Sequence, residues 1–215
     1  MSAGGLAERL ARDLLRIGAV ALRPEAPFTW ASGRRAPIYT DNRLTLAHPA
    51  VRSAIAEGLA DLARGVGADL VAGTATAGIA HAALAADRLG LPMCYVRAQA
   101  KAHGRGNLIE GEVRRGQRAA VVEDLVSTGG SVLAAAEALR RAGAEPVAAL
   151  AVFTYGLGEA DAAFEAAGLP LHVLTSYAAL VDVAEADGAL APDALVSLRE
   201  WRADPAAWSA RHGGA

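Results

Sequence analysis

Two adjacent acidic residues, Glu123 and Asp124, follow an apolar run and precede a loop of small residues from Ser127 to Ser131. Small residues that begin a helix expose backbone N–H groups and the positive end of the helix dipole, and both favour a phosphate. The two carboxylates would repel that phosphate at close range, so they are expected to serve ribose hydroxyls or a bound Mg²⁺ beside it. A phosphate next to a diol describes a ribose 5-phosphate.

A plainer interpretation exists for the acidic pair alone, in which Glu123 and Asp124 only cap the loop or the helix that follows. The complete loop favours the phosphate interpretation. Two other phosphate motifs are absent, since the chain has no Gly-x-x-x-x-Gly-Lys-Ser/Thr and no Gly-x-Gly-x-x-Gly after a strand. A second turn, from Gly73 to Ile79, has a similar strand-turn-helix form, and either a second phosphate or close packing explains its small residues.

A long polar segment, from Ala98 to Gly116, contains the second group of candidate residues, among them Lys101 and His103. Loops of this length inside a compact domain are typical of lids over a site. Cations and proton donors on a lid favour a leaving group that gains negative charge, such as pyrophosphate, although a solvated hairpin is the alternative. Lys101 is the only lysine among 21 basic residues, which singles out this position.

Short apolar segments alternate with helical patterns along most of the chain, which predicts an α/β fold with a parallel sheet flanked by helices. The predicted strands span residues 69–72, 92–97, 118–123, 146–153 and 171–174. The predicted helices span residues 48–65, 78–89, 130–142 and 159–167. Because ligands bind at the carboxyl ends of such strands, the acidic pair is expected at the ligand crevice.

The two ends of the chain have different patterns. Residues 1–16 mix charged and apolar side chains as an amphipathic helix does, and they do not resemble a signal peptide. Residues 28–46 are rich in strand formers and turn residues, which predicts a small β cap. We therefore expect one domain over residues 1–215, with residues 1–46 contributing the helix and cap, and a frayed tail over residues 204–215.

Composition limits the classes of partner. The 215 residues, 53% of them hydrophobic, are enough for a full core. A single cysteine, Cys94, excludes an internal disulfide and fits a reducing cytoplasm. A net charge of −2 provides no field for nucleic acid or anionic lipid, and the uncharged stretch 70–86 contains glycines, threonines and His81, which is expected to be structural. A cytoplasmic protein with a small anionic ligand, no nucleic acid and no membrane is predicted.

The stretch from Val122 to Ser131 resembles the ribose-phosphate signature of the type I phosphoribosyltransferase family, in which two acids precede a Thr-Gly-Gly or similar loop. Four further motifs resemble the orotate phosphoribosyltransferases within that family. They are Phe-Thr-Trp-Ala-Ser-Gly from Phe28, Pro-Ile-Tyr-Thr-Asp-Asn-Arg from Pro37, Ala-Thr-Ala-Gly-Ile from Ala75 and Tyr-Val-Arg-Ala-Gln-Ala-Lys-Ala-His-Gly from Tyr95. The resemblance implies the type I phosphoribosyltransferase fold, a central parallel sheet flanked by helices with a small N-terminal β cap, or hood.

The activity implied by the resemblance is transfer of the 5-phosphoribosyl group from phosphoribosyl pyrophosphate to orotate, giving orotidine 5′-monophosphate and pyrophosphate in pyrimidine biosynthesis. Lys101, His103 and Asp124 would be catalytic, Ser127 would also contact orotate, and Mg²⁺ would be held through the donor with no assigned protein ligand. The implied donor-binding residues are Arg97, Lys101, His103, Glu123, Asp124, Leu125, Val126, Ser127, Thr128, Gly129, Gly130 and Ser131. The family's lid crosses a homodimer interface, so Arg97, Lys101 and His103 would complete the partner's site.

The chain departs from the family pattern at several positions. Ala31, Ala77 and Ala98 stand where many members carry lysine, so these three are not assigned as ligands. Some members hold orotate with an arginine at the place of Tyr155-Gly156, so the resemblance assigns no partner for the orotate carboxylate. Two alternatives remain open from the sequence: the same chemistry on another base, and a regulatory protein of the same fold that senses the donor or binds nucleic acid. The lid cations favour catalysis, and the balanced charge disfavours a nucleic-acid surface.

Overall fold

The strand order of the central sheet decides where a ligand binds. The computed structural model describes residues 3–30, 32–99 and 108–214. Across the sheet the strands are β10 (Leu171–Ser176), β9 (Glu145–Thr154), β8 (Arg118–Val126), β5 (Leu70–Thr74), β6 (Met93–Val96) and β7 (Ile109–Glu110). Only β7, which sequence patterns did not predict, runs antiparallel to its neighbour. The chain moves outward from β5 in one direction and from β8 in the other, so the topological switch point lies between β5 and β8.

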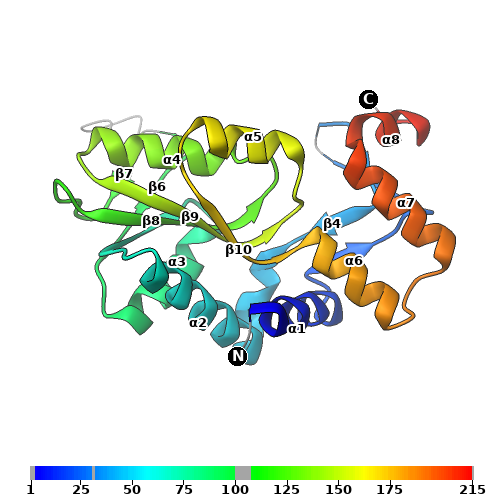
Figure 1. Ribbon diagram of the computed structural model, residues 1–215, viewed down its shortest axis with the longest axis horizontal. Coiled ribbons are helices and arrows are strands. Elements are labelled where there is room, and N and C mark those ends of the chain that lie inside the picture. The colour runs from blue at the N-terminus through cyan, green and yellow to red at the C-terminus, as the bar shows by residue number, and fades with distance from the viewer. Residues whose placement is uncertain (1–2, 31, 100–107, 215) are drawn as a thin grey trace.

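Helices cover both faces of this sheet (Figure 1). On one face lie α2 (Pro49–Gly65) and α3 (Gly78–Leu89), and on the other lie α4 (Gly130–Arg141) and α5 (Gly158–Ala166). Leu10 of the N-terminal helix shares the core of the α2–α3 face. The alternation of side chains along β8 explains this, since Ala120 and Val122 pack in the α2–α3 core while Ala119 and Val121 pack in the α4–α5 core. A strand buried on both faces is a continuous apolar run, as the sequence shows.

A second lobe, which we call the hood, contains segments from both ends of the chain. Its N-terminal part contains β1 (Val20–Leu22), β2 (Phe28–Thr29), β3 (Arg35–Ala36) and β4 (Ile38–Thr40), which form two small antiparallel sheets. Its C-terminal part contains α6 (Tyr177–Ala186), α7 (Pro192–Ala203) and α8 (Pro205–Arg211), which lie beside β4 at the right of Figure 1. Leu14 of α1 (Ala3–Arg16), Ile38, Trp201 and Trp208 share one apolar core there. The β cap predicted over residues 28–46 thus lies beside C-terminal helices that the sequence patterns did not predict.

The central strands and helices predicted from the sequence are confirmed within a few residues. The prediction of a frayed tail over residues 204–215 is wrong. Residues 205–211 form α8, whose Trp208 and Ser209 are fully buried. Asp204 caps this helix by accepting a hydrogen bond from the Ala207 N–H at 2.9 Å, and Pro205 occupies its first turn. The Trp208 indole also donates to Ser197 Oγ at 3.0 Å. These contacts hold the tail, and α6 and α7 were likewise not predicted.

The uncharged stretch 70–86 forms a strand and a helix, as predicted from its turn residues. In the part of the chain that the structure describes, no helix is both long enough and apolar enough to cross a membrane. Cys94 is buried in β6, and burial raises the pKa of its thiol to about 11, so it remains an unreactive thiol near neutral pH.

Trp208→Ala is expected to lower the free energy of unfolding by about 3–5 kcal/mol, because it removes a large buried side chain and leaves a cavity. Chemical denaturation followed by circular dichroism measures this loss. Arg211→Ala on the same helix is the matched control, since it removes only an exposed ion pair to Glu200, and a change of about 1 kcal/mol or less is expected. Equal losses in the two variants would contradict the docking of α8 on the hood core.

Candidate active site

The crevice at the switch point opens because β8 is longer than its neighbour β5. Pairing between the two strands ends at Gly73 and Val122, where Thr74 Oγ1 donates to the Val122 carbonyl at 3.1 Å. On its other side, β8 stays paired with β9 as far as Val126. The predicted end of this strand at residue 123 is therefore wrong, and the acidic pair lies within the strand, on the stretch that β5 leaves uncovered.

The acidic pair has one buried and one half-buried carboxyl group. Glu123 is 7% exposed and accepts hydrogen bonds from the Asp124 N–H at 3.1 Å and from Ser131 Oγ at 3.0 Å. Burial is the main cause that raises the pKa of Glu123 to about 7, and the adjacent Asp124 carboxylate adds to the rise. Hydrogen bonding to Thr74 and to the Asp124 amide lowers the pKa and partly offsets this. Near neutral pH the pair carries less than its full negative charge, which suits a crevice that must admit an anionic ligand.

The loop after β8 has the backbone of an anion cradle. Gly129 has φ +85°, a conformation that favours glycine, and a Cβ there would lie 2.7 Å from the Phe164 ring. The next residue begins α4, whose first N–H groups have no partner inside the helix and are available to an anion. Because Ser131 also donates to Glu123, the cradle and the acidic pair are joined by a direct hydrogen bond.

The hood is fastened to this crevice by side chains of the 37–43 motif. Asn42 Nδ2 donates to the Asp124 carbonyl at 2.7 Å, so the hood holds the backbone of the acidic pair. Tyr155, at the end of β9, donates from its hydroxyl to Thr40 Oγ1 at 3.2 Å. Burial raises the pKa of Tyr155 to about 12, so the phenol stays protonated near neutral pH.

A buried histidine lies near the acidic pair on the α3 side. His81 is 1% exposed, and neither ring nitrogen has a hydrogen-bond partner among the residues described. Burial lowers the pKa of His81, and the nearby Asp124 carboxylate partly offsets this, so the ring is neutral near pH 7. Its burial agrees with the structural role predicted from the sequence, but its unpaired nitrogens leave a polar group next to Asp124 that packing alone does not explain.

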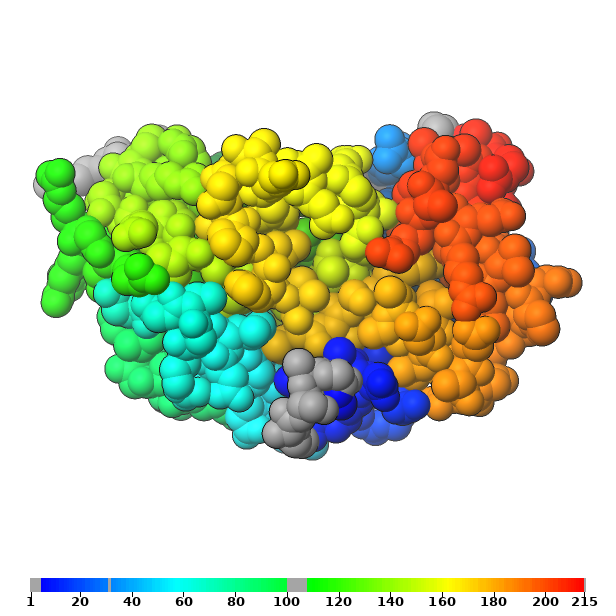
Figure 2. Space-filling model, in the orientation of Figure 1, coloured from blue at the N-terminus to red at the C-terminus, as the bar shows by residue number. Residues whose placement is uncertain are grey.

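Two cavities open on either side of the cradle. The larger, about 650 Å³, lies between the hood and the α4–α5 side of the core, and Ser127 and Thr128 form part of its wall. In Figure 2 it corresponds to the notch between the yellow atoms of α5 and the red atoms of the C-terminal helices. The smaller, about 340 Å³, contains Ser131, Thr74 and Arg97. Both volumes suit parts of a small ligand, and the cradle stands between them.

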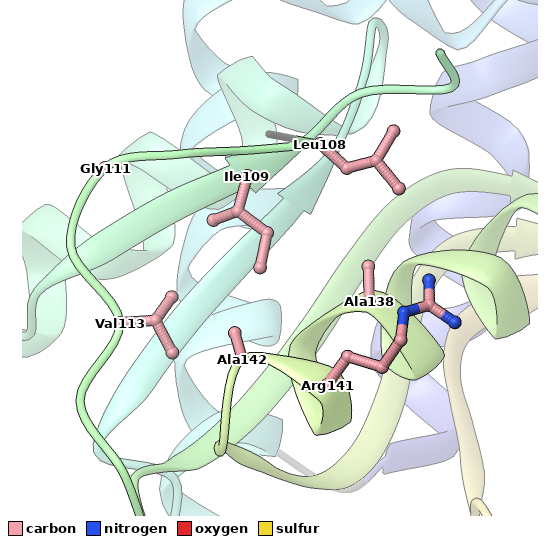
Figure 3. A pocket seen from close by; sticks show the side chains of 7 residues that line it. All are labelled: Leu108, Ile109, Gly111, Val113, Ala138, Arg141 and Ala142. Carbon is pink, nitrogen blue, oxygen red and sulfur yellow. The ribbon is translucent and has the colours of Figure 1, made fainter. Parts of the chain in front are cut away.

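A third cavity, about 420 Å³, lies away from the predicted site. Figure 3 shows Leu108, Ile109 and Val113 facing α4 across it, and the α4 residues are Ala138, Arg141 and Ala142. It contains no predicted site residue, although Arg141 also borders the 340 Å³ cavity. Arg141 is its one charged lining residue, and neither the acidic pair nor the cradle borders it.

Comparison with known proteins agrees with the geometry of the crevice. The family model of the phosphoribosyl transferase domain matches residues 45–164, more than half of the chain. Orotate phosphoribosyltransferase of Bacillus pumilus (strain SAFR-032) is 56% identical over 203 residues, which cover 94% of this chain and 96% of that relative. The chain belongs to the orotate phosphoribosyltransferase family. Membership confirms the resemblance drawn from the signature loop and the four motifs.

Solved structures of this family share the fold. Orotate phosphoribosyltransferase from Aeropyrum pernix is 32% identical, with a TM-score of 0.73 over 85% of this chain and 99% of that chain. The Mycobacterium tuberculosis H37Rv enzyme in complex with 5-phospho-α-D-ribosyl 1-diphosphate is 28% identical, with a TM-score of 0.64 over 81% of this chain and 98% of that chain. The predicted type I phosphoribosyltransferase fold is confirmed, with the additional antiparallel strand β7 at one edge.

The residues predicted for this family site fall into three groups. Those from Glu123 to Ser131 come together in one strand and loop at the crevice. Arg97 follows β6, borders the 340 Å³ cavity and forms an ion pair with Glu110 at 3.5 Å. Lys101 and His103 lie outside the described residues, and so does Ala31.

Several residues at the crevice were not predicted from the sequence. Asn42 and Thr40 belong to a motif that had been matched to the family, so that motif was the available signal, but their hydrogen bonds to the core were not predicted. Arg34, Arg35 and Arg202 border the 650 Å³ cavity, and no local pattern marks them. They come from the two ends of the chain, which only the hood brings together.

Glu123→Gln is expected to stabilise the fold at pH 7 and above by on the order of 2 kcal/mol relative to the unmodified chain, and the gain should vanish in acid. The pKa of Glu123 in the folded state, about 7, exceeds its ordinary value of 4.5, so ionisation costs native stability as the pH rises through that window. Glutamine does not ionise. Urea unfolding from about pH 4 to about pH 9 measures the difference, with exposed Glu137→Gln as control. A difference that does not vary with pH would contradict the buried, protonated carboxyl.

Proposed function

We propose that this chain transfers the 5-phosphoribosyl group of phosphoribosyl pyrophosphate to orotate, giving orotidine 5′-monophosphate and pyrophosphate. The observation that carries the proposal is the crevice at the β5–β8 switch point, where the Glu123–Asp124 pair is hydrogen-bonded to the Ser127–Ser131 cradle. The high identity to a relative of that activity, and a family member in complex with the donor, support the choice of substrates.

The cradle and the acidic pair bind different parts of the ribose 5-phosphate. The free N–H groups at the start of α4 bind the 5-phosphate, and the carboxyls bind the ribose hydroxyls beside it. As the bond from the anomeric carbon to pyrophosphate breaks, positive charge develops on the sugar ring, and the adjacent Asp124 carboxylate stabilises it. A ring nitrogen of orotate then forms the new bond to that carbon, so the reaction requires no covalent nucleophile from the protein.

The base and the leaving pyrophosphate occupy different cavities in this proposal. The base occupies the 650 Å³ cavity, where the Ser127 hydroxyl is within reach of it. Pyrophosphate leaves on the side of the 340 Å³ cavity, which Thr74 and the cradle residue Ser131 border. Because the cradle lies between the two cavities, the attacking nitrogen and the leaving oxygen meet the sugar from different sides.

Mg²⁺ is the cofactor that we propose, and the residues present fit an ion carried by the donor. Among residues 3–30, 32–99 and 108–214, no cluster of three or more His, Cys, Asp or Glu side chains is placed to hold a metal. The acidic pair offers at most part of an octahedral oxygen shell, which donor oxygens and water would complete. When bound, the ion neutralises charge on the leaving pyrophosphate.

The predicted lid, residues 98–116, contributes the remaining groups in this proposal. Lys101 and His103 would close over pyrophosphate as its charge builds, and, as the family resemblance implies, they would do so in the partner subunit of a homodimer. The backbone N–H of Arg97 donates to the Leu108 carbonyl at 2.8 Å, so the described residues on either side of residues 100–107 meet beside the 340 Å³ cavity, which supports a lid at this place.

Orotate consumption is expected only when phosphoribosyl pyrophosphate and Mg²⁺ are both present, because the charge on the donor must be neutralised before pyrophosphate leaves. The assay follows orotate absorbance and pyrophosphate release, and excess EDTA should abolish both. A panel containing uracil, hypoxanthine and adenine tests the alternative substrates. Equal turnover with another base would contradict the choice of orotate, and donor binding without turnover of any base would favour a sensor.

Lys101→Ala is expected to lower kcat by a factor on the order of 10² to 10³, the usual loss when one preorganised charge-stabilising group is removed. Asp124→Asn should also be inactive. When the two variants are mixed and re-annealed, activity should return, because one site of the heterodimer would receive intact Asp124 from one chain and intact Lys101 from the other. Proven subunit exchange without recovered activity would show that the lid closes over its own subunit.

A further inference from the structure

The proposed substrate raises a requirement that the predicted site does not meet. Orotate carries a carboxylate at neutral pH, and an anion placed in a cavity without a positive partner loses hydration that nothing replaces. Strand β9 ends at Thr154, and the next residues that border the cavity are Leu157, Gly158 and Glu159, none of which is a cation. The Ser127 hydroxyl can donate one hydrogen bond but no charge. The need for a cation in this cavity rests on the proposed function.

Arg202, in the last turn of α7, lies where a positive charge is needed. Its Nη2 is 3.2 Å and its Nε 3.5 Å from the position that a Cβ on Gly156 would take. Gly156 has φ +64°, so a side chain there would be strained and would also press on the guanidinium. The glycine therefore leaves the space beside Tyr155 to an arginine from another part of the chain.

Aromatic packing holds this end of α7 against the cavity wall. Trp201, the residue before Arg202, is 1% exposed. Its ring makes edge-on contacts with Tyr155, at 5.6 Å between centroids, and with Trp30, at 6.0 Å. Because Trp30, Trp201 and Arg202 all border the 650 Å³ cavity, the same packing fixes both the wall and the start of the arginine side chain.

The guanidinium of Arg202 is available to a ligand. Within the residues that the structure describes, it forms no ion pair or hydrogen bond. Arg35, on the same cavity, already donates to Thr29 Oγ1 at 2.6 Å. Asp161 and Asp182 border an adjacent cavity together with Arg202, and neither is paired with it. Arg34, on the turn between β2 and β3, is exposed, as Arg202 is, but the three atoms nearest to a Cβ on Gly156 all belong to Arg202.

We propose that Arg202 binds the orotate carboxylate and thereby makes the site specific for an anionic base. A guanidinium matches a carboxylate with two parallel hydrogen bonds, which gives geometric selection as well as charge. The carboxylate would lie over Gly156, with the Ser127 hydroxyl at the other edge of the base. Arg202 thus supplies the positive charge that strand β9 does not provide.

Orotidine monophosphate and uridine monophosphate differ only in the carboxylate, so their binding isolates the role of Arg202. The unmodified chain should bind the first more tightly, and Arg202→Gln should remove about 10- to 100-fold of that preference, as expected for hydrogen bonds to a charged group. Uridine monophosphate binding should stay within about threefold. In turnover, the orotate KM should rise by the same factor while the donor KM is unchanged, and Arg202→Lys should recover part of the loss.

Two arginines serve as matched controls. Arg199→Gln, one turn earlier on α7, removes only an ion pair to Glu185, and Arg34→Gln removes a second exposed arginine of the same cavity. Neither should change the preference, and unfolding midpoints check the fold of each variant. Equal weakening of both nucleotides by Arg202→Gln, or a loss of preference in Arg34→Gln instead, would overturn the proposal. An unmodified chain without activity would refute the proposed function. The nucleotide-binding comparison would still test the role of Arg202, because it requires no turnover.

Discussion

The different lengths of β5 and β8 are the constraint on which the site depends. β5 stops pairing with β8 at Val122, while β9 keeps β8 extended as far as Val126. Residues 123–126 of β8 therefore pair with β9 on one side and face an open crevice on the other. Carboxylates in a loop would sample many directions, but here two of them are held by a strand at the switch point of the sheet.

The hood adds a wall to this crevice without covering it. Its core joins Leu14 from the first helix to Trp201 and Trp208 from the last two, so both ends of the chain are needed to build it. Two hydrogen bonds, from Asn42 to the Asp124 carbonyl and from Tyr155 to Thr40, connect this wall to the strand ends. Packing that stabilises the hood therefore also sets the width of the 650 Å³ cavity.

Charge in this protein is arranged locally. The net charge of −2 does not attract an anion, yet the cradle provides N–H groups, and arginines border both cavities. The acidic pair is compatible with this arrangement because burial keeps Glu123 partly protonated. In the proposed function, the phosphates of the ligand would meet positive potential and its sugar would meet hydrogen-bonding carboxyls.

The sequence by itself determined the features that depend on neighbouring residues. The signature from Val122 to Ser131, the alternation of strands and helices and the motif around Asn42 are local, so they predicted the fold and the family, and they led to the prediction that residues 123–131 bind the donor. The length of β8 past Glu123, the docking of Trp208 and the approach of Arg202 to Gly156 depend on residues distant along the chain. Only the tertiary structure decided these, because register, burial and distance arise when separate segments pack together.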